Sequence, residues 1–432
     1  MSPLFGFVAD DLTGASDVLA QAHKYGLDAV LVVGEGPLPT DADVVGIAGP
    51  ARSLGGAAFD ALVRRQLERM ADADVEVLLY KVCSTFDSAP ALGSIGRGIE
   101  LLRERHPGHG PIPVAPAQPE FGRFTVFSDH YATHAQTVYR LDRHPVMSRH
   151  PSTPMHESDL RRILAGQLTG PLARVGEVHL PAHDDGTFSG RWHDRRQDPE
   201  LAAFVLDAVE ERHLDTIAAA LRQGGRPGSP ALVVGSGGIM AALARTVSQG
   251  RARAPEPQRA SGPVLALSAS ASSVTADQID DAVAHGWQDV AVPTELLDGP
   301  APDTQALIED GVRTALAAGR DVVVHTTRGI ADPRYARGAI AAEHVGGLIG
   351  GLAARMAMAG LTRDIAVLGG DTSSHALTAM GVRRLRVADQ FVTAGPVCRT
   401  DDAAAVAGCR LLLKGGQVGP PDILRRFAGH IS

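Results

Sequence analysis

The chain has 432 residues, a formal net charge of −8 and an aromatic content of 4%. This length exceeds one ordinary domain, so we expect two. The acidic balance and the scarcity of aromatic residues argue against a nucleic-acid-binding protein. The absence of an apolar run near ~20 residues argues against a membrane span.

The first ten residues contain no basic region, and acidic residues arrive before an apolar core could form. We therefore expect no secretory leader and a cytoplasmic location. Cys83, Cys398 and Cys409 are too few and too scattered for a disulfide framework or a zinc site.

The first half of the chain alternates short apolar runs with helical patterns. Continuous β-branched runs, which suit strands covered on both faces, predict strands at residues 4–8, 29–33, 44–48 and 75–82. Helices are expected from the turn after the first strand to about residue 23 and over residues 56–70. This alternation predicts an α/β sheet whose ligands gather where strands end and helices begin.

The segment from about residue 107 to 200 is rich in proline, histidine and glycine and has weak periodicity. It is interpreted as long excursions from the sheet, with one helix over residues 158–167. His144, His150 and His156 are spaced by six, which fits neither helical nor metal-ligand spacing, so they are interpreted as loop residues.

The second half repeats the alternation after a break. A strand at residues 231–234 leads into Gly-Ser-Gly-Gly and a helix, and strands then follow at 264–267, 290–292, 322–325 and 365–368, with a long helix over about 337–358. Residues 248–262 are polar, contain proline and lack periodic apolar positions, which predicts a linker. We therefore predict an α/β fold of two domains, residues 1–247 and 263–432, with mainly parallel sheets facing a shared cleft.

Asp10 and Asp11 open the run Asp-Asp-Leu-Thr-Gly-Ala-Ser-Asp at a predicted strand-to-helix turn. Carboxylates there could orient or deprotonate a substrate hydroxyl near the amides of a helix N-terminus. The alternative is an N-cap, which needs no substrate. One carboxylate suffices for a cap, so the adjacent pair favours a functional site.

Lysine is rare in this chain, because only Lys24, Lys81 and Lys414 are lysines among 41 basic residues. A lysine kept in an arginine-rich chain indicates a place that needs a compact point charge. Lys81 begins Lys-Val-Cys-Ser-Thr-Phe-Asp-Ser, and a lysine beside hydroxyls at a strand end suits a carboxylate or a polyol. Arg52 could clamp a carboxylate, whereas Cys83 is interpreted as a semi-buried structural thiol rather than a nucleophile.

Three loops of small residues follow predicted strands or precede helices in the second domain, at residues 268–275, 369–374 and 414–419. Small residues let backbone amides approach phosphates, and Lys414 adds a point charge, so the three loops together indicate a nucleotide. No lysine stands in Gly-Lys-Ser/Thr, which excludes a P-loop, and residues 235–238 imitate the dinucleotide fingerprint only loosely. Phosphoryl transfer fits better, with one domain holding phosphates and the other a hydroxyl.

Taken in order, these residues resemble the four-carbon acid sugar kinases over nearly the whole chain. The resemblance rests on Ala-Asp-Asp-Leu-Thr-Gly-Ala-Ser-Asp at 9–17, Lys-Val-Cys-Ser-Thr-Phe-Asp-Ser at 81–88, Gly-Ser-Ile-Gly at 93–96, His-Pro-Ser-Thr-Pro-Met at 150–155 and the loops at 268–272, 369–373 and 414–419. The runs at 81–88 and 93–96 are similar to the branch that acts on 3-oxo-tetronates.

This resemblance implies a kinase that uses ATP and Mg²⁺ to phosphorylate a terminal hydroxyl of a small 3-oxo sugar acid. Asp10 or Asp11 would be the catalytic base. The sugar acid would bind the N-terminal domain at Asp10, Arg52, Lys81, Cys83, Ser84 and Thr85. ATP would bind the C-terminal domain at Ser268, Ser270, Ser272, Gly369, Gly370, Asp371, Thr372, Lys414, Gly415, Gly416 and Gln417. No metal ligand is assigned, and a homodimer is left open as the assembly.

The sequence departs from the family pattern at several positions, including Ala269, Ala271 and Asp371. Gly415, Gln417 and Val418 replace the usual residues of the last loop, and residues 120–132 lack the glycine usual after the Gly-Arg strand. The acid could therefore be 3-oxo-isoapionate, threonate or erythronate instead. Two other classes stay open: an NAD-dependent sugar-acid dehydrogenase that uses residues 235–238, and a non-catalytic acid-sensing module.

Overall fold

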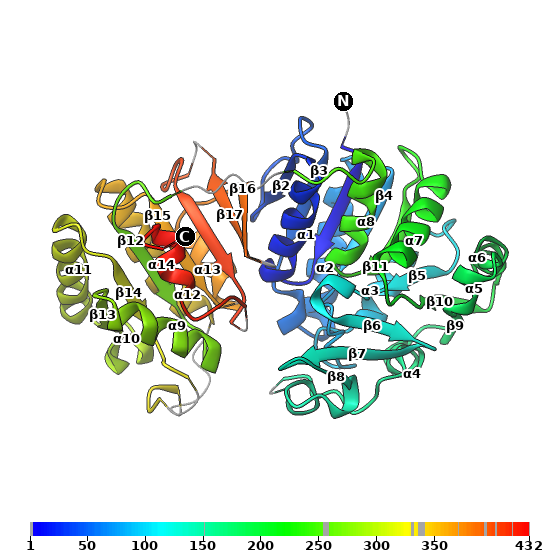
Figure 1. Cartoon of the computed structure of the whole chain (residues 1–432), viewed down its shortest axis with the longest axis horizontal. Coiled ribbons are helices and arrows are strands. Elements are labelled where there is room, and N and C mark those ends of the chain that lie inside the picture. Colours follow the sequence, from blue (N-terminus) through cyan, green and yellow to red (C-terminus); the bar gives the residue numbers. More distant parts are fainter. Residues whose placement is uncertain are drawn as a thin grey trace. The chain divides into compact units, whose positions relative to one another are not determined.

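The computed structural model describes residues 3–150, 152–253, 259–329, 332–335, 342–369, 371–392, 395–401, 404–416 and 418–431. The chain forms two compact units, drawn in Figure 1. The first comprises Met1–Ala29 and Pro37–Arg253, and the second comprises Val30–Gly36 and Ala254–Ser432. The predicted α/β class, with two domains and mainly parallel sheets, is confirmed. None of the helices in the described ranges is both long and apolar enough to cross a bilayer.

The sheet of the first unit has the strand order β3-β1-β4-β11-β5-β10-β9, and neighbouring strands run parallel. Its strands are β1 (Phe5–Ala9), β3 (Val44–Ala48), β4 (Val77–Lys81), β5 (Ile112–Ala115), β9 (Arg174–Val178), β10 (Leu201–Leu206) and β11 (Ala231–Gly235). The central strands β1, β4 and β11 are buried at every position. Such continuous apolar runs require helices on both faces of the sheet.

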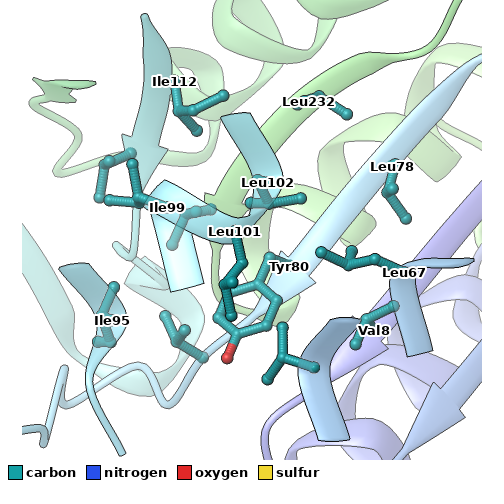
Figure 2. Packing of buried hydrophobic residues seen from close by; sticks show 14 of the residues in the cluster. Val8, Leu67, Leu78, Tyr80, Ile95, Ile99, Leu101, Leu102, Ile112 and Leu232 are labelled. Carbon is teal, nitrogen blue, oxygen red and sulfur yellow. The ribbon is translucent and has the colours of Figure 1, made fainter. Parts of the chain in front are cut away.

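One face of this sheet is covered by α2 (Gly56–Ala71), α3 (Ile95–Arg105) and α4 (Leu160–Ala165), whose apolar side chains share one core cluster with the strands. Figure 2 shows Val8, Leu78 and Tyr80 of the strands in this cluster, beside Leu67 of α2 and Leu101 of α3. The helices α1 (Leu12–Lys24), α7 (Glu211–Gly224) and α8 (Gly237–Ser248) pack against one another and contribute nothing to that cluster. They cover the opposite face.

Between β5 and β9 lies a separate antiparallel sheet of β6 (Arg123–Val126), β7 (Asp129–His134) and β8 (Thr137–Arg140). Its tight turns place Phe127, Ser128, Ala135 and Gln136 at positive φ, as the type I′ hairpin requires. The same region holds η2 (Pro119–Phe121), η3 (Leu141–Arg143), η4 (Met147–Arg149), α5 (Pro181–Asp184) and α6 (Phe188–Gln197). We expected mainly irregular excursions here. Strands of four to six residues with mixed polar faces carry too little periodicity to be recognised.

The sheet of the second unit has the order β13-β14-β12-β15-β18-β17-β16-β2. The strands β12 (Val264–Ser268), β13 (Gln288–Ala291), β14 (Val322–His325), β15 (Asp364–Leu368) and β18 (Arg410–Lys414) run parallel. The strands β17 (Gly395–Thr400), β16 (Arg384–Val392) and β2 (Ala29–Val32) extend the sheet in antiparallel pairs. A segment near the start of the chain therefore ends the sheet of the second unit, because Val30–Val32 pair with Arg384–Arg386.

The second unit also has helices on its sheet. They are α9 (Ser273–Ala284), α10 (Thr294–Asp298), α11 (Pro302–Ala317), α12 (Ala342–Met358), α13 (Asp371–Ala379) and α14 (Ile423–Ala428). Apolar residues of α9 and α14 share a core cluster with β12, β15 and β18. The first residues of the predicted helix over about 337–358 lie outside the described residues.

Candidate active site

The carboxyl ends of the central strands of the first unit meet at one edge of its sheet. Ala9 of β1 is in register with Lys81 of β4, which is in register with Gly235 of β11. The loops that begin at Asp10 and Val82 are therefore neighbours, and the Asp10 amide donates to the carbonyl of Lys81 at 3.1 Å. The parallel register thus brings the two predicted acid-binding motifs together.

Arg52, in the short helix η1 (Ala51–Ser53), holds both aspartates of the first motif. Its Nη2 and Nε donate to Oδ1 and Oδ2 of Asp10 at 3.0 and 3.2 Å, and its Nη1 lies 2.9 Å from Oδ2 of Asp11. Asp11 is also the N-cap of α1 and accepts from the amide of Gly14. The N-cap alternative therefore holds for Asp11, while Asp10 has no capping contact.

Gly14 is required at this turn for steric reasons. A Cβ there would lie 2.6 Å from Oδ1 of Asp11, 3.0 Å from Nζ of Lys81 and 3.7 Å from Oδ1 of Asp10. These three polar groups thus converge on the first turn of α1. The buried lysine donates to the carbonyl of Val82 at 2.9 Å, and its Nζ lies 3.9 Å from Oδ2 of Asp17.

Asp10 and Asp87, two of the three carboxylates around Arg52, differ in their electrostatics. Burial, with the neighbouring charge of Asp11, raises the pKa of Asp10 to about 6, although Arg52 opposes the rise. Burial acts on Asp87 in the same direction, but Arg52 and the hydroxyl of Thr85 outweigh it, so the pKa of Asp87 is lowered. Of the two, Asp10 is therefore the carboxylate whose proton affinity is adjusted toward neutral pH; burial raises the pKa of Asp17 as well, although Lys81 opposes the rise.

The second motif forms a polar loop after β4. The Sγ of Cys83 lies 3.0 Å from Oγ1 of Thr85, which donates to Oδ1 of Asp87 at 2.6 Å. The carbonyl of Ser84 accepts from Nε2 of His130 at 2.8 Å. Burial, with the charge of Asp87, raises the pKa of Cys83 to about 11, so the group remains a thiol at neutral pH.

Three residues of this site were not predicted from the sequence. Asp87 lies within the recognised motif, but only the structure links it to Arg52, with 4.0 Å between Oδ2 and Nε. His150 lies in a loop after η4, as predicted, but its contribution to the lowered pKa of Asp87 was not predicted. His130 had no signal in the sequence, because its role follows from the pairing of β6 with β7.

The second unit collects its predicted loops in the same way. Ser268 of β12 is in register with Leu368 of β15, and Leu368 is in register with Lys414 of β18. Ser268 is also in register with His325 of β14, which brings the Thr326–Gly329 loop to this edge. Sequence analysis did not select Thr326 or Thr327, although both are buried there.

Lys414 is the most unusual charge at this edge. The residue is 1% exposed and donates to Oγ1 of Thr275 at 3.3 Å and to the carbonyl of Gly415 at 2.9 Å. Among the residues that the structure describes, no carboxylate pairs with it. Burial therefore lowers its pKa to about 7. An anion beside the ammonium group would compensate the loss of water.

The small residues of the second unit lie within contact distance of one another. A Cβ at Gly416 would lie 2.5 Å from Oγ of Ser270 and 3.2 Å from Cβ of Ser272, so a larger residue there would displace these serines. Ser272 precedes α9, and its buried Oγ has no hydrogen-bond partner in the described part of the chain. A buried hydroxyl without a partner at a helix N-terminus, close to a buried lysine, is suited to phosphate oxygens.

The remaining predicted nucleotide residues are placed as follows. Gly369 has φ of +123° and donates its amide to the carbonyl of Lys414 at 3.1 Å. Only the backbone of Asp371 and Thr372, at the start of α13, is described, and Gly370 and Gln417 lie outside the described residues. Within the described ranges, no three His, Cys, Asp or Glu side chains form a group that could hold a metal ion.

Comparison with known proteins matches both units. Residues 5–243 match the family described as "Sugar-binding N-terminal domain", and residues 265–424 match "Nucleotide-binding C-terminal domain". The chain is 33% identical to a 3-oxo-isoapionate kinase of Paraburkholderia graminis, over 96% of this chain and 92% of the relative. It is 29% identical to a 3-oxo-tetronate kinase of Pseudomonas fluorescens, over 100% and 97%, and 29% identical to a D-threonate kinase of Bordetella bronchiseptica, over 99% and 98%.

Solved structures share the fold. One is a protein of Salmonella typhimurium LT2, described provisionally as a tRNA synthase, with a TM-score of 0.80, 24% identity and 99% of each chain covered. Another is a Haemophilus influenzae protein with a TM-score of 0.72, 22% identity, and 98% and 99% of the two chains covered. At these identities the likeness concerns the fold alone.

Proposed function

Because the chain belongs to the four-carbon acid sugar kinase family, we propose that it transfers the γ-phosphoryl group of ATP to a terminal hydroxyl of a small 3-oxo sugar acid. One observation carries the proposal. Each unit has, at the carboxyl ends of its parallel strands, the chemistry that one half of this reaction needs. The first has buried carboxylates around Arg52, and the second has the buried Lys414, which pairs with no carboxylate among the residues described.

In the first unit, Asp10 is the proposed base. A carboxylate with a pKa of about 6 is ionised at neutral pH and is a better proton acceptor than an ordinary aspartate. The two contacts from Arg52 fix the direction of its oxygens. Asp11 is committed to its cap and to Arg52, which supports a positioning role. Arg52, Lys81, Cys83, Ser84 and Thr85 would line the bound acid.

In the second unit, the phosphates of ATP would meet Lys414, the hydroxyls of Ser270 and Ser272, and the N-terminus of α9. This residue set fits a nucleotide, because among the described residues no carboxylate pairs with Lys414 and the Oγ of Ser272 has no hydrogen-bond partner. Gly369 and Gly416 would allow the backbone to approach those oxygens. Ser268, Gly370, Asp371, Thr372, Gly415 and Gln417 remain proposed nucleotide residues by family resemblance.

Transfer also needs a divalent cation, which we propose to be Mg²⁺. Mg²⁺ usually binds through the substrate phosphates and only one or two carboxylates. This binding mode is compatible with the described residues, among which no three His, Cys, Asp or Glu side chains form a metal-binding group. When bound, the ion would compensate the charge of the phosphates. Asp10 and its neighbours would orient the hydroxyl and accept its proton.

The structure gives no support to the dehydrogenase alternative. The glycines of the turn after β11 are required by packing within the protein. A Cβ at Gly237 would lie 2.2 Å from Oδ2 of Asp17, and one at Gly238 would lie 2.6 Å from the carbonyl of Ala117. The turn is therefore in contact with other protein atoms where a dinucleotide-binding loop would approach the pyrophosphate.

The test is ADP release with Mg-ATP and a panel of 3-oxo-tetronate, 3-oxo-isoapionate, threonate and erythronate. The 33% identical relative and the altered stretch at 120–132 place 3-oxo-isoapionate first for the assay. We expect turnover of one or more acids. ATP binding with no turnover of any acid would contradict the proposal and favour the sensing module.

A further inference from the structure

If the proposed function holds, the substrate has a permanent carboxylate, and the first unit must supply a cation for it. The cluster at the ends of β1 and β4 is a poor place for a further anion. It contains four carboxylates, Asp10, Asp11, Asp17 and Asp87, against the two cations Arg52 and Lys81. A substrate carboxylate beside Arg52 would meet the negative charge that already surrounds this guanidinium.

Arg123, the first residue of β6, has a different set of partners. Its Nη1 donates to the carbonyls of Phe121, Gly122 and Thr133 at 2.8, 3.3 and 3.3 Å. Its Nε is buried without a hydrogen-bond partner in the described part of the chain, where no carboxylate forms an ion pair with the guanidinium. Its charge is therefore not compensated by the residues described.

The position of Arg123 on the hairpin directs it toward the acid site. Alternate residues of a strand share a face, so Arg123 lies on the same face of β6 as Thr125. Thr125 contacts His130 across the pair with 3.0 Å between Oγ1 and Nδ1, and His130 in turn donates from Nε2 to the carbonyl of Ser84 at 2.8 Å. This face of the small sheet is thus the one that contacts the loop after β4.

Two further observations agree with this placement. Burial lowers the pKa of Arg123, and Cys83, the residue before Ser84, acts electrostatically in the opposite direction. The residue opposite Arg123 on β7 is Ala132, a buried small side chain that leaves the arginine without a bulky cross-strand neighbour. Arg123 as a whole residue is only partly buried, although its Nε is buried.

We infer that Arg123 binds the carboxylate of the sugar acid, while the cluster around Arg52 receives the hydroxyl to be phosphorylated. Arginine suits this task because its planar fork matches a carboxylate with two parallel hydrogen bonds, as Arg52 itself does with Asp10. The assignment separates the two ends of the substrate: the fixed anion lies beside the hairpin, and the reacting hydroxyl lies beside the base.

A structural role must be distinguished from this one, because an arginine can also serve only to hold carbonyls. Arg103 does so in the same unit, since its Nη1 donates to the carbonyls of Leu201 and Ala202 at 3.3 and 3.1 Å. It is on α3 and has no contact with the loop after β4. Arg103→Met is therefore a matched control that removes the same kind of contact outside the site.

The experiment compares KM for the best acid of the panel, and for its primary amide, in the full-length wild type, Arg123→Met, Arg123→Lys and Arg103→Met. We expect Arg123→Met to raise KM for the acid by about 10- to 100-fold, the loss typical of a charged hydrogen bond. KM for ATP should stay unchanged, and the preference for the acid over its amide should disappear. Arg123→Lys keeps the positive charge but loses the planar pair of donors, so its KM for the acid should lie between those of the wild type and Arg123→Met.

Each outcome decides between the alternatives. An unchanged acid KM and preference in Arg123→Met, or equal increases in Arg123→Met and Arg103→Met, would overturn the inference and leave the proposed function intact. If Arg123→Met does not fold, an acid KM in Arg123→Lys equal to that of the wild type would overturn it. If the wild type turns over no acid, the proposed function is wrong and the inference falls with it.

Discussion

Substitution of Asp10 by asparagine should abolish turnover without weakening the fold. The change removes the charge, keeps the shape of the side chain and leaves an amide oxygen to accept from Arg52. Loss of a positioned base typically lowers the rate by about 10²- to 10⁴-fold. We therefore expect kcat to fall by that factor, with KM for ATP unchanged, because Asp10 belongs to the proposed acid site and not to the proposed nucleotide site.

The stability of this variant follows from the pKa of the carboxyl group. Folding raises the pKa of Asp10 from 3.8 to about 6, so its ionised form is less favourable in the folded state by about 3 kcal/mol at 1.36 kcal/mol per pKa unit. This penalty is absent below pH 3.8, grows between pH 3.8 and 6 and is complete above pH 6. Asp10→Asn should therefore be more stable than the wild type at pH 8, and this difference in stability should be smaller at pH 5.

The assays are kcat by ADP release and the free energy of unfolding in urea at pH 8 and pH 5. Asp11→Ala is the comparison variant, because it removes the N-cap of α1, which typically contributes about 1 kcal/mol, together with the ion pair to Arg52, so it should be less stable than the wild type at both pH values. Turnover of Asp10→Asn within tenfold of the wild type would refute the base. A lower stability of this variant at pH 8 would refute the electrostatic reasoning.

Three further predictions concern the nucleotide, the metal and the thiol. Lys414→Met should raise the Kd for ATP by about 10- to 100-fold. The wild type should bind ATP more weakly as pH rises through about 7, because Lys414 loses its proton, and the variant should lose this pH dependence. Calorimetry that shows no pH dependence of ATP binding by the wild type would contradict this. EDTA should abolish ADP release until Mg²⁺ is added back, while calorimetric binding of the sugar acid persists; turnover in EDTA would exclude a required metal. Cys83→Ser should keep kcat within about threefold, because a thiol with a pKa of about 11 is no nucleophile at neutral pH, and a loss beyond 100-fold would contradict this.

The sequence allowed the α/β class to be predicted because buried parallel strands are short continuous apolar runs. β1 and β4 are such runs, and each is followed by a loop whose residue types predicted a ligand site. The partner of a strand is not encoded in such a run. Nothing in Ala29–Val32 indicated that Val30–Val32 would pair with Arg384–Arg386 in the sheet of the second unit.

The candidate site was predictable where consecutive residues carry its chemistry, as in Asp10-Asp11 and in the run from Lys81. What escaped prediction depends on contacts between distant segments. The link of Arg52 to two aspartates spans 41 and 42 residues, and the contact of His130 with Ser84 spans 46. Arg123 entered the sequence analysis only as part of a departure from the family pattern. Its Nε, which has no hydrogen-bond partner among the described residues, is placed by the β6–β7 hairpin, and the sequence periodicity did not predict that hairpin.

The most direct test of the account is ADP release by the wild type with Mg-ATP and each acid of the panel, measured beside Asp10→Asn. The account predicts turnover of one or more 3-oxo sugar acids by the wild type and a loss of about 10²- to 10⁴-fold in the variant. Binding of ATP and acid without ADP release by the wild type would contradict the kinase, and equal turnover by the two proteins would contradict the site.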